Sequence, residues 1–528
     1  MVLRVGPSWG VYPAPGVVFG GPPKNRVGGT PTRTREPRML PESSHTRHYR
    51  LIRLHPPENA FKMYDSKNSM ADYDLIVVGG GPAGYVGAIR AGQLGKKVAC
   101  VEMDRAGGTC LNWGCIPTKS LLKNAEVYQM MAHHAGDFGL TVEGLKFDWE
   151  KVIGRSRKVA DKLAGGIEML FKKNKIDYIR GEASVVKPGV VEVTDKDGKK
   201  SELTGAKMLI ATGVVSREMP GFPFNGKSVI GSKQAMVLSA QPKDIVIIGA
   251  GAIGIEFAYF FNAFGTKVTV VEMLPNILPV EDTEVSVALE KSLTKQGIRL
   301  LTGTKVDKAE TTNKGVRLTV SGKTQETIEA EIALVAIGVS PLMPQGLKLE
   351  TDPKGWIKTD DNYETSVKGI YGAGDIIGPP WLAHVASYEA IQAVEGMFAG
   401  KKPKKVSVFP GCTYCQPQVA SVGLTERAAK EKGLKFKVGK FPFLASGKAL
   451  AVGESEGFVK LLFGEKHGEV IGAHIIGADA TEMIAELGLA ITLEATHEEL
   501  ISTIHAHPTL SEAIHEAAEQ SQGHAIHI

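Results

Sequence analysis

The chain has 528 residues, a formal net charge of +5 and 23% charged residues. This length predicts about three or four domains, and a hydrophobic fraction of 43% is typical of a globular protein with a large core. Much of the positive charge lies in the first 70 residues and no recognisable nucleic-acid-binding module accompanies it, so the charge does not indicate a nucleic-acid partner.

Cysteines are few for a chain of this length. They are Cys100, Cys110, Cys115, Cys412 and Cys415. A secreted disulfide framework would use more, so we expect a reducing compartment, where a close cysteine pair is catalytic or binds a metal. The longest strongly apolar run, residues 245–261, is interrupted by glycines and is too short to span a membrane. We therefore expect no membrane-spanning helix.

The N-terminal stretch, residues 1–70, shows neither helical nor strand periodicity and contains paired prolines and paired glycines. We expect it to be disordered because it cannot bury a core. Several arginines and the lack of an acidic residue before Glu36 suit a transit peptide, which would place the protein in an organelle matrix. The stretch is also poor in Ser and rich in Pro and Gly, so we favour a nonfunctional leader and a cytoplasmic protein that starts near Met70.

A strand, a glycine-rich turn and a helix open the ordered sequence. Residues 74–78 form a short, apolar, β-branched run, and a helical pattern follows to Leu94. Residues 97–101 predict a second strand, which ends at Glu102. The turn between the first strand and the helix carries the spaced glycines Gly79, Gly81 and Gly84.

The same pattern begins again 170 residues later, and Glu272 takes the place of Glu102. Strands are predicted over residues 244–248 and 267–271, with a helix between them. The glycines of the second turn are Gly249, Gly251 and Gly254. Two copies in the same register are far more specific than a single glycine motif.

Each glycine turn follows a strand and opens a helix, which is the context of a dinucleotide-binding fingerprint. The glycines permit a tight turn and the close approach of a pyrophosphate, and the helix N-terminus offers unpaired N–H groups to the phosphates. The acid at the end of the next strand accepts hydrogen bonds from a ribose. The alternative interpretation is a pair of glycine-rich turns in ordinary α/β units.

Glu272 bears on the choice of nicotinamide cofactor. A carboxylate favours the free 2′-hydroxyl of NAD and repels the 2′-phosphate of NADP. No Arg follows closely to receive a phosphate, so the sequence favours NAD. If Glu272 is only a solvated strand end, NADP stays open. The first turn has a cysteine pair shortly after Glu102, which suits a flavin dinucleotide.

Residues 107–119 carry the most specific chemistry. Four residues separate Cys110 from Cys115, which brings the two sulfurs together if the backbone turns. Pro117 predicts a helix that begins near Cys115, and both a helix N-terminus and the charge of Lys119 favour a thiolate. The alternatives are a structural disulfide or two buried thiols. A zinc site would need two further ligands, and none is suggested nearby, so we expect no metal.

A dithiol reaction needs a base because the thiolate attacks and the thiol does not. Near the C-terminus, a neutral imidazole at His507 with Glu512 as its carboxylate partner suits this role at neutral pH. From the spacing alone, the favoured interpretation is a solvated histidine and glutamate around a helix start.

The chain resembles the pyridine nucleotide-disulfide oxidoreductases over nearly all of residues 72–523. The segments that carry the resemblance are Gly107–Lys119, Ala211–Gly213, Gly249–Glu256 and Gly372–Asp375. The resemblance implies an α/β protein with two Rossmann-like dinucleotide-binding domains and a C-terminal α+β dimerisation domain. The implied boundaries are 1–70 for the extension, 71–216 for the FAD-binding domain, 217–341 for the NAD-binding domain, 342–407 for a central domain and 408–528 for the dimerisation domain.

The resemblance implies FAD and NAD as cofactors. The residues that it assigns to them are Gly79, Gly81, Gly84, Glu102, Gly108, Thr109, Lys119, Thr212, Gly213, Gly249, Gly251, Gly254, Glu256, Glu272, Gly338, Asp375 and Ala383. Asp375 looks like the aspartate that bonds the ribityl chain, although alone it would be an ordinary turn residue. Lys119 and Glu256 look like the family's charged pair near the flavin, although in isolation they would be ordinary helix charges.

For the C-terminal pair, the resemblance reverses the interpretation from spacing. His507 falls on the family's base and Glu512 on its carboxylate partner, while His505 is expected to support the shape of the motif. In the family this base reaches the neighbouring subunit's site, which implies a homodimer. The catalytic residues implied are therefore Cys110, Cys115, His507 and Glu512.

The implied activity is the oxidation of a protein-bound dihydrolipoyl group with reduction of NAD+. The implied partner is the lipoyl-bearing subunit of a 2-oxoacid dehydrogenase complex or the carrier protein of glycine cleavage. Two alternatives stay open: an NADPH-dependent disulfide or metal-ion reductase of the same family, and a nonenzymatic flavoprotein subunit of a complex.

One departure from the family pattern is the C-x-x-C of Cys412 and Cys415, where many members have Thr-x-Pro-Glu. This pair would be redox-active or structural. We favour a structural role because the pair lies at the predicted start of the dimerisation domain.

Overall fold

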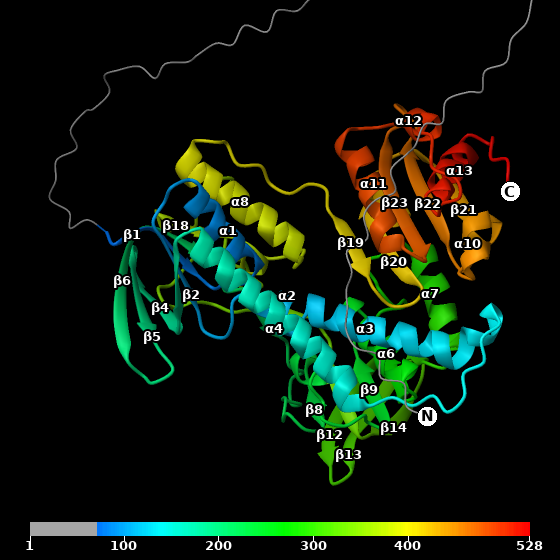
Figure 1. The fold of residues 1–528 in the computed structure, drawn as a ribbon, viewed down its shortest axis with the longest axis horizontal. Helices are drawn as coiled ribbons and strands as arrows, with labels where there is room; N and C mark the ends of the chain where they lie inside the picture. The colour runs from blue at the N-terminus through cyan, green and yellow to red at the C-terminus, as the bar shows by residue number, and fades with distance from the viewer. Residues whose placement is uncertain (1–70) are drawn as a thin grey trace, which may run out of the picture. The chain divides into compact units, whose positions relative to one another are not determined.

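The structure is a computed structural model and describes residues 71–528 (Figure 1). The expectations of a disordered stretch, a transit peptide or a leader concern residues 1–70 and lie outside the described residues. The expected α/β class is confirmed, because two of the three large sheets have parallel cores and the third is antiparallel with helices packed on it. The domain boundaries expected from the sequence stay predictions.

Eight strands form the first sheet, in the order β17-β4-β5-β6-β1-β2-β3 with β18 beside β6. They are β1 (Tyr73–Val78), β2 (Val98–Glu102), β3 (Ile176–Arg180), β4 (Glu182–Lys187), β5 (Val190–Thr194), β6 (Lys200–Ile210), β17 (Gln345–Gly346) and β18 (Ile370–Gly372). The central strands pair in parallel, whereas β4, β5 and β6 pair antiparallel.

The apolar run of β1 is buried on both faces. Leu75 and Val77 belong to the core beneath the helices, and Ile76 and Val78 belong to the core beneath the β4–β5 hairpin. A continuous hydrophobic run, rather than an alternating one, is typical of a parallel strand that is covered on both sides.

Helices surround this sheet and carry the chain toward the next one. They are α1 (Pro82–Gln93), α2 (Gly108–Trp113), α3 (Cys115–Gln129), α4 (Trp149–Lys173) and α8 (Ala383–Ala399), with the shorter turns η1 (Met130–His134), η2 (Ala135–Phe138) and η3 (Asp375–Ile377). Although α1 and α8 are far apart in sequence, they pack side by side (Figure 1). Because β18 also joins β6, residues 370–399 return to the first sheet.

The second sheet has five parallel strands in the order β11-β10-β9-β15-β8. Its strands are β8 (Val229–Ile230), β9 (Asp244–Ile248), β10 (Lys267–Val271), β11 (Arg299–Leu301) and β15 (Ile332–Val335), and its helices are α5 (Ser232–Ala235), α6 (Ala252–Ala263) and α7 (Thr283–Lys295). A three-stranded antiparallel sheet follows β11, and β7 pairs with β16. These strands are β7 (Val214–Ser216), β12 (Thr304–Thr312), β13 (Gly315–Gly322), β14 (Glu326–Ala330) and β16 (Val339–Pro341).

The strand registers confirm the internal repeat. In the first sheet Val77 lies opposite Cys100, and in the second sheet Ile247 lies opposite Val270. Each residue of the second pair stands 170 positions after its counterpart in the first. The two glycine turns therefore leave equivalent strands at equivalent positions.

The third sheet is antiparallel, with the order β19-β20-β23-β22-β21. Its strands are β19 (Pro410–Thr413), β20 (Gln418–Gly423), β21 (Phe436–Pro442), β22 (Phe458–Gly464) and β23 (Val470–Gly477). Its helices are α9 (Glu426–Glu431), α10 (Gly447–Val452), α11 (Ala480–Thr492), α12 (His497–Ser502) and α13 (Glu512–Ser521), with the short turn η4 (Phe443–Ala445). Helices α11 and α13 pack on the sheet, which gives the expected α+β arrangement.

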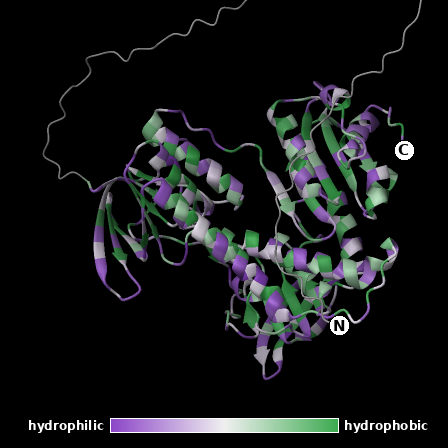
Figure 2. Ribbon diagram, viewed as in Figure 1, coloured by the Kyte–Doolittle hydropathy of each residue, from purple (hydrophilic) through white to green (hydrophobic). Residues whose placement is uncertain are grey.

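The most apolar run of the sequence becomes β9 and α6. Helix α6 is hydrophobic around most of its circumference, as its colour in Figure 2 shows. This suits its position, since it is buried in the core that β9 and α3 share. Phe257, Phe260 and Phe261 of this helix are almost fully buried. Within residues 71–528, no helix combines the length and the apolar character needed to cross a membrane.

Candidate redox and dinucleotide site

The first glycine turn brings backbone segments closer together than any side chain permits. Gly79 has φ of 101°, and a Cβ on Gly84 would lie 1.8 Å from the Gly79 carbonyl oxygen. The Glu102 carboxylate is held at the turn because it accepts hydrogen bonds from the N–H groups of Gly80 (2.7 Å) and Asp104 (2.8 Å). This leaves bare backbone and the N-terminus of α1, with Gly81 as its N-cap, facing the crevice.

The second turn repeats this geometry closely. Gly249 has φ of 103°, and a Cβ on Gly254 would lie 2.0 Å from the Gly249 carbonyl oxygen. The Glu272 carboxylate accepts hydrogen bonds from Ala250 N–H and Leu274 N–H, each at 2.8 Å. Gly251 is the N-cap of α6. The two sequence copies thus make two turns of equivalent geometry, and each has the shape that suits an anion.

Further predicted cofactor residues gather at the same edge of the first sheet as Gly79. Strands β1, β6 and β18 end level with one another, because Val78 pairs with Ile210 and Ile210 with Gly372. Thr212 and Asp375 follow the last two of these strands, at the carboxyl edge where α/β sheets bind their ligands. Thr212 Oγ1 is buried without a hydrogen-bond partner among the described residues. Burial raises the pKa of Asp375 to about 6.

The remaining predicted cofactor residues lie on turns or at helix starts. Gly213 and Gly338 both have positive φ, at 71° and 105°, and the strands that follow them, β7 and β16, pair with each other. Ala383 is the first residue of α8. A Cβ on Gly108 would lie 2.5 Å from Gly81 Cα, so the redox segment sits directly on the first glycine turn.

Cys110 lies in the short helix α2, and Cys115 is the first residue of α3. The helix start predicted near Cys115 is therefore confirmed, whereas the short helix that carries Cys110 and Thr109 was not expected. Both cysteines are free thiols, and they lie close enough for each to shift the pKa of the other. The segment turns sharply at Gly114, which caps both helices.

The two thiols have opposite acidities. The pKa of Cys115 is lowered, mainly by the interaction with the Cys110 thiol; together with the positive charge of Lys119, this outweighs the opposing effect of burial. The pKa of Cys110 is raised, first by its hydrogen bond to the Cys115 sulfur and then by burial. Cys115 is the group that carries a negative charge when the pair is reduced, and its place at a helix N-terminus agrees with this.

An ion pair connects α3, the helix that begins at Cys115, to the second sheet and to the third sheet. Lys119 Nζ lies 2.9 Å from a carboxylate oxygen of Glu256 on α6, and Glu256 is buried. Tyr414 N–H donates to the same carboxylate at 2.9 Å, and Lys119 Nζ lies 4.3 Å from the Tyr414 ring centroid. The sequence pattern did not single out Tyr414, because it acts through its backbone, which any residue type supplies.

His507 and Glu512 form the hydrogen-bonded pair expected from the family pattern. His507 Nδ1 lies 2.9 Å from Glu512 Oε1, and Thr509 N–H donates to Oε2 at 2.8 Å. The pKa of Glu512 is lowered, because these bonds outweigh the effect of its burial. The His507 side chain is 82% exposed, and no hydrogen bond of the described residues joins it to Cys110 or Cys115 within one chain.

His505 has the supporting position expected of it. It is almost buried, its Nδ1 lies 3.1 Å from the Thr503 carbonyl oxygen, and its Nε2 lies 2.8 Å from a carboxylate oxygen of Glu486 on α11. These contacts anchor the segment before α13 to the third sheet's helices. His505 thereby fixes the loop that presents His507.

The second cysteine pair has no feature of a redox centre. Cys415 is fully buried, its thiol lies 3.3 Å from the Pro417 carbonyl oxygen, and burial raises its pKa. Burial also raises the pKa of Cys412 to about 11. Both are free thiols. A neutral thiol is a poor nucleophile, so these observations favour the structural role.

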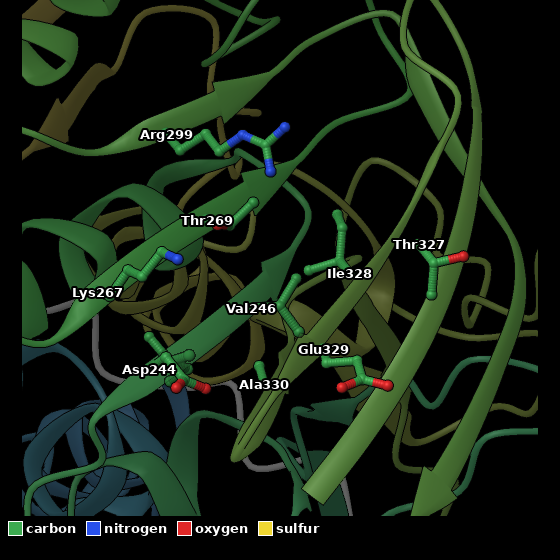
Figure 3. A pocket seen from close by; sticks show the side chains of 10 residues that line it. Asp244, Val246, Lys267, Thr269, Arg299, Thr327, Ile328, Glu329 and Ala330 are labelled. Atoms are coloured by element: carbon green, nitrogen blue, oxygen red, sulfur yellow. The ribbon is translucent and has the colours of Figure 1, made fainter.

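A separate pocket opens at the opposite edge of the second sheet (Figure 3). Asp244, Lys267 and Arg299 line it, and they are the first residues of β9, β10 and β11. The glycine turn lies at the carboxyl ends of these strands, so this pocket is not part of the dinucleotide crevice. Among residues 71–528, no three His, Cys, Asp or Glu side chains are grouped so as to hold a metal ion.

Proteins of known sequence extend these observations. The chain is similar to the dihydrolipoyl dehydrogenases of Chlorobaculum parvum (46% identity, 86% of this chain and 98% of the relative) and Rhizobium etli (45%, 86% and 99%). The mitochondrial dihydrolipoyl dehydrogenase of Pisum sativum is 39% identical over 86% of this chain and 92% of its own length.

Solved structures and family models agree with this. LpdA from Mycobacterium tuberculosis superposes with a TM-score of 0.78 at 26% identity, covering 84% of this chain and 99% of LpdA. The Cu(II) complex of the HOCl-induced flavoprotein disulfide reductase RclA from Escherichia coli has a TM-score of 0.76 at 25% identity, covering 85% of this chain and 100% of RclA. The model described as pyridine nucleotide-disulphide oxidoreductase matches residues 73–390, and the model of that family's dimerisation domain matches residues 409–518. With two glycine turns, a polarised cysteine pair and both models in order along it, the chain belongs to the pyridine nucleotide-disulphide oxidoreductase family.

Proposed function

We propose that the chain is a dihydrolipoyl dehydrogenase, which oxidises a protein-bound dihydrolipoyl group and reduces NAD+ to NADH. The observation that carries this proposal is a cysteine pair, Cys110 and Cys115, whose pKa values are shifted in opposite directions, in a chain that also has two equivalent glycine turns. The high identity to dihydrolipoyl dehydrogenases along most of the chain supports the choice of substrate.

FAD and NAD are the cofactors, and the residues present fit them. Gly84 and Gly254 let each helix pack against its own turn, and the space beside Gly81 and Gly251 is open, with no atom closer than 3.8 Å to a Cβ added there, which suits two pyrophosphates. The unpartnered hydroxyl of Thr212 and the carboxyl of Asp375 offer hydrogen bonds to the flavin side of the crevice. When bound, FAD would accept two electrons from the reduced cysteines and pass them on to NAD+.

Glu272 gives the reason to prefer NAD over NADP. Its carboxylate is fixed by two backbone N–H donors and is followed by Met273, Leu274 and Pro275, none of which offers a positive charge. A 2′-phosphate would meet a buried negative charge there without a compensating cation. This argument weighs against an NADPH-dependent reductase.

His507 is placed to act as the base toward the substrate. With its Nδ1–H donating to Glu512, the neutral ring keeps Nε2 free to accept a proton from a dihydrolipoyl thiol. The resulting thiolate attacks the Cys110 sulfur of the Cys110–Cys115 disulfide, and Cys115 leaves as a thiolate. Lys119 and the N-terminus of α3 stabilise that charge.

The second half of substrate oxidation closes the lipoyl disulfide, while His507 keeps the proton of the first thiol. The other substrate thiol attacks the substrate sulfur of the mixed disulfide, which releases Cys110, and its own proton goes to the Cys110 sulfur. Cys110 holds this proton, in keeping with its raised pKa. The pair is then reduced by two electrons, with the charge on Cys115.

The active form proposed is a homodimer in which the base of one subunit serves the cysteine pair of the other. The exposure of His507 and the dimerisation-domain match support this arrangement. The partner proposed is the lipoyl-bearing subunit of a 2-oxoacid dehydrogenase complex or the glycine cleavage carrier protein. The small number of cysteines agrees with a reducing compartment, and a cytoplasmic location is part of the proposal.

The test is a comparison of substrates on purified flavin-loaded protein. We expect dihydrolipoamide with NAD+ to be the best pair, and we expect Cys110→Ser and Cys115→Ser to abolish its turnover. Cys412→Ser is the matched control and should retain activity. A preference for NADPH with glutathione or mercuric ion, or full turnover by Cys110→Ser, would overturn the proposal.

A further inference from the structure

Trp113 lies between the two redox cysteines and ends α2. Its indole N–H donates to the Asp104 carboxylate at 2.7 Å. Two cations stand over its ring: Lys233 Nζ lies 4.3 Å and the Arg157 guanidinium carbon 5.0 Å from the ring centroid. We refer to Trp113, Asp104, Arg157 and Lys233 as the Trp113 clamp.

The clamp joins α2 to three separate elements. Asp104 follows β2, and its N–H donates to Glu102, the acid of the first glycine turn. Arg157 belongs to α4 and also donates to the Asn112 carbonyl oxygen at 2.7 Å. Lys233 belongs to α5 of the second sheet, and its Nζ lies 3.4 Å from the Asp104 carboxylate. Helix α2 is therefore held by contacts from both dinucleotide-binding units.

Single contacts of this kind are weak when exposed. Both Lys233 and Asp104 are about half exposed, so their ion pair alone contributes little. Each cation over the indole also stabilises only weakly at such exposed sites. Their joint effect differs from that of an isolated pair, because all of them converge on one side chain at the end of a six-residue helix, where they add to the buried Leu111 and Asn112.

The clamp acts on the thiols through geometry rather than charge. The charged groups that act most strongly on Cys110 and Cys115 are Lys119, Asp375 and Glu256, and none belongs to the clamp. Tyr85 of α1 also faces both sulfurs. Cys110 precedes Trp113 by three positions on the same helix, so rotation of α2 about its axis would turn the Cys110 thiol away from Cys115.

We infer that Trp113 is a positioning residue for the redox pair, and that the Trp113 clamp orients α2 so that the Cys110 thiol lies beside the Cys115 sulfur. Through Lys233 the same contacts tie the redox helix to the NAD-binding unit. This inference rests on the proposed function only in taking the Cys110–Cys115 pair as redox-active.

The test measures thiol reactivity in dithiothreitol-reduced, flavin-loaded protein. Iodoacetamide is reacted over a range of pH, and fragment-ion mass spectrometry assigns the alkylation to Cys110 or Cys115. For Trp113→Leu we expect the midpoint of the Cys115 profile to rise by about one pH unit, the shift that the loss of one hydrogen bond to a thiolate produces. We also expect a larger share of alkylation at Cys110.

Conservative variants separate positioning from general damage. Trp113→Phe keeps a ring beneath the cations but loses the N–H donor, so its midpoint should fall between those of wild type and Trp113→Leu. Lys233→Met should raise the midpoint and Lys233→Arg should restore it. Lys151→Gln is the control, because Lys151 is also a lysine near this region, is 84% exposed, and pairs only with Asp148.

An unchanged Cys115 midpoint in Trp113→Leu, with native circular dichroism, overturns the inference. If Trp113→Leu does not fold, wild-type midpoints in both Trp113→Phe and Lys233→Met overturn it. The alkylation profile needs no lipoyl substrate. A chain that fails to oxidise dihydrolipoamide but shows the shift therefore disproves the proposed function and leaves the clamp intact.

Discussion

The pKa values of two carboxyl groups, Glu512 and Glu281, are shifted in opposite directions. Glu512 has a lowered pKa because Thr509 N–H and His507 hydrogen-bond to its carboxylate. Glu281 has its pKa raised to about 7 by burial, helped by the nearby Asp282 and opposed by a bond from Ser421. Hydrogen bonds favour the ionised form of Glu512, whereas burial favours the protonated form of Glu281.

We expect Glu512→Gln to lower kcat with dihydrolipoamide by about 10- to 100-fold, less than the roughly 10²- to 10⁴-fold that a positioned base contributes, because His507 itself remains. The substitution replaces the charged carboxylate that accepts the Nδ1–H bond of His507 by a neutral amide. The Nδ1–H tautomer is then favoured less, so Nε2 is less often free to take the proton. KM should change little. Steady-state kinetics check this, with Glu498→Gln on the adjacent α12 as control, and an unaltered kcat would show that the pair is not catalytic.

Glu281 predicts a pH dependence of stability. Since its pKa in the folded chain is raised to about 7 from 4.5, the folded state binds the proton more tightly, and stability falls as pH rises from about 4.5 to 7. Its Oε2 has no hydrogen-bond partner among the described residues, so no bond is lost there by substitution.

Glu281→Gln removes this dependence. We expect the variant to gain stability over wild type at pH 8, by at most about 3 kcal/mol, and to show no gain at pH 5. Urea denaturation at the two pH values measures the difference. An equal effect of the substitution at both pH values would mean that the carboxyl does not titrate in this window.

At the level of elements, the two glycine turns offer a matched experiment. Gly84→Ala places a Cβ 1.8 Å from the Gly79 carbonyl oxygen, and Gly254→Ala places one 2.0 Å from the Gly249 carbonyl oxygen. Neither helix can keep its position against its strand. We expect Gly84→Ala to lose flavin, and Gly254→Ala to keep flavin but bind NADH at least about 10-fold more weakly.

The flavin-to-protein absorbance ratio and an NADH titration measure these losses. Gly165→Ala in α4 is the control, because no atom lies within 4 Å of the added Cβ and Ala favours a helix. Loss of flavin from Gly254→Ala with retention by Gly84→Ala would reverse the assignment of the two turns.

These elements also show what a sequence predicts and what it does not. The β1–α1–β2 and β9–α6–β10 units were predictable because strand, turn and helix are written in consecutive residues. The return of β18 and α8 to the first sheet was not, since it depends on pairing between Tyr371 and Leu209, far apart in the chain. Tyr414 and the clamp residue Arg157 were missed for the same reason: their partners are neighbours only in space.

At the level of the whole molecule, the helices of the third sheet and the loop before the proposed base carry exposed apolar side chains. Leu489, Leu493 and Ile504 are 59%, 68% and 98% exposed, and the last of these lies three positions before His507. Large exposed apolar side chains are common on surfaces that another protein covers. The dimerisation-domain match over residues 409–518 supports a second copy of this chain as that protein.

Complementation between two inactive variants tests whether the base works across the dimer. His507→Ala keeps its cysteine pair but has no base. Cys110→Ser keeps its base but lacks the sulfur that the substrate thiolate attacks. In a mixed dimer, the proposed arrangement unites the intact cysteines of one subunit with the intact histidine of the other, so one of the two sites is complete.

Random mixing of co-expressed subunits makes half of the dimers mixed, so we expect about a quarter of wild-type dihydrolipoamide turnover from two variants that are each inactive alone. If the base served the cysteine pair of its own chain, every site in the mixed dimer would lack one group and the mixture would stay inactive. The recovered activity should also fall on dilution below the dimer's dissociation constant, because a site built by two chains lasts only as long as the interface that joins them.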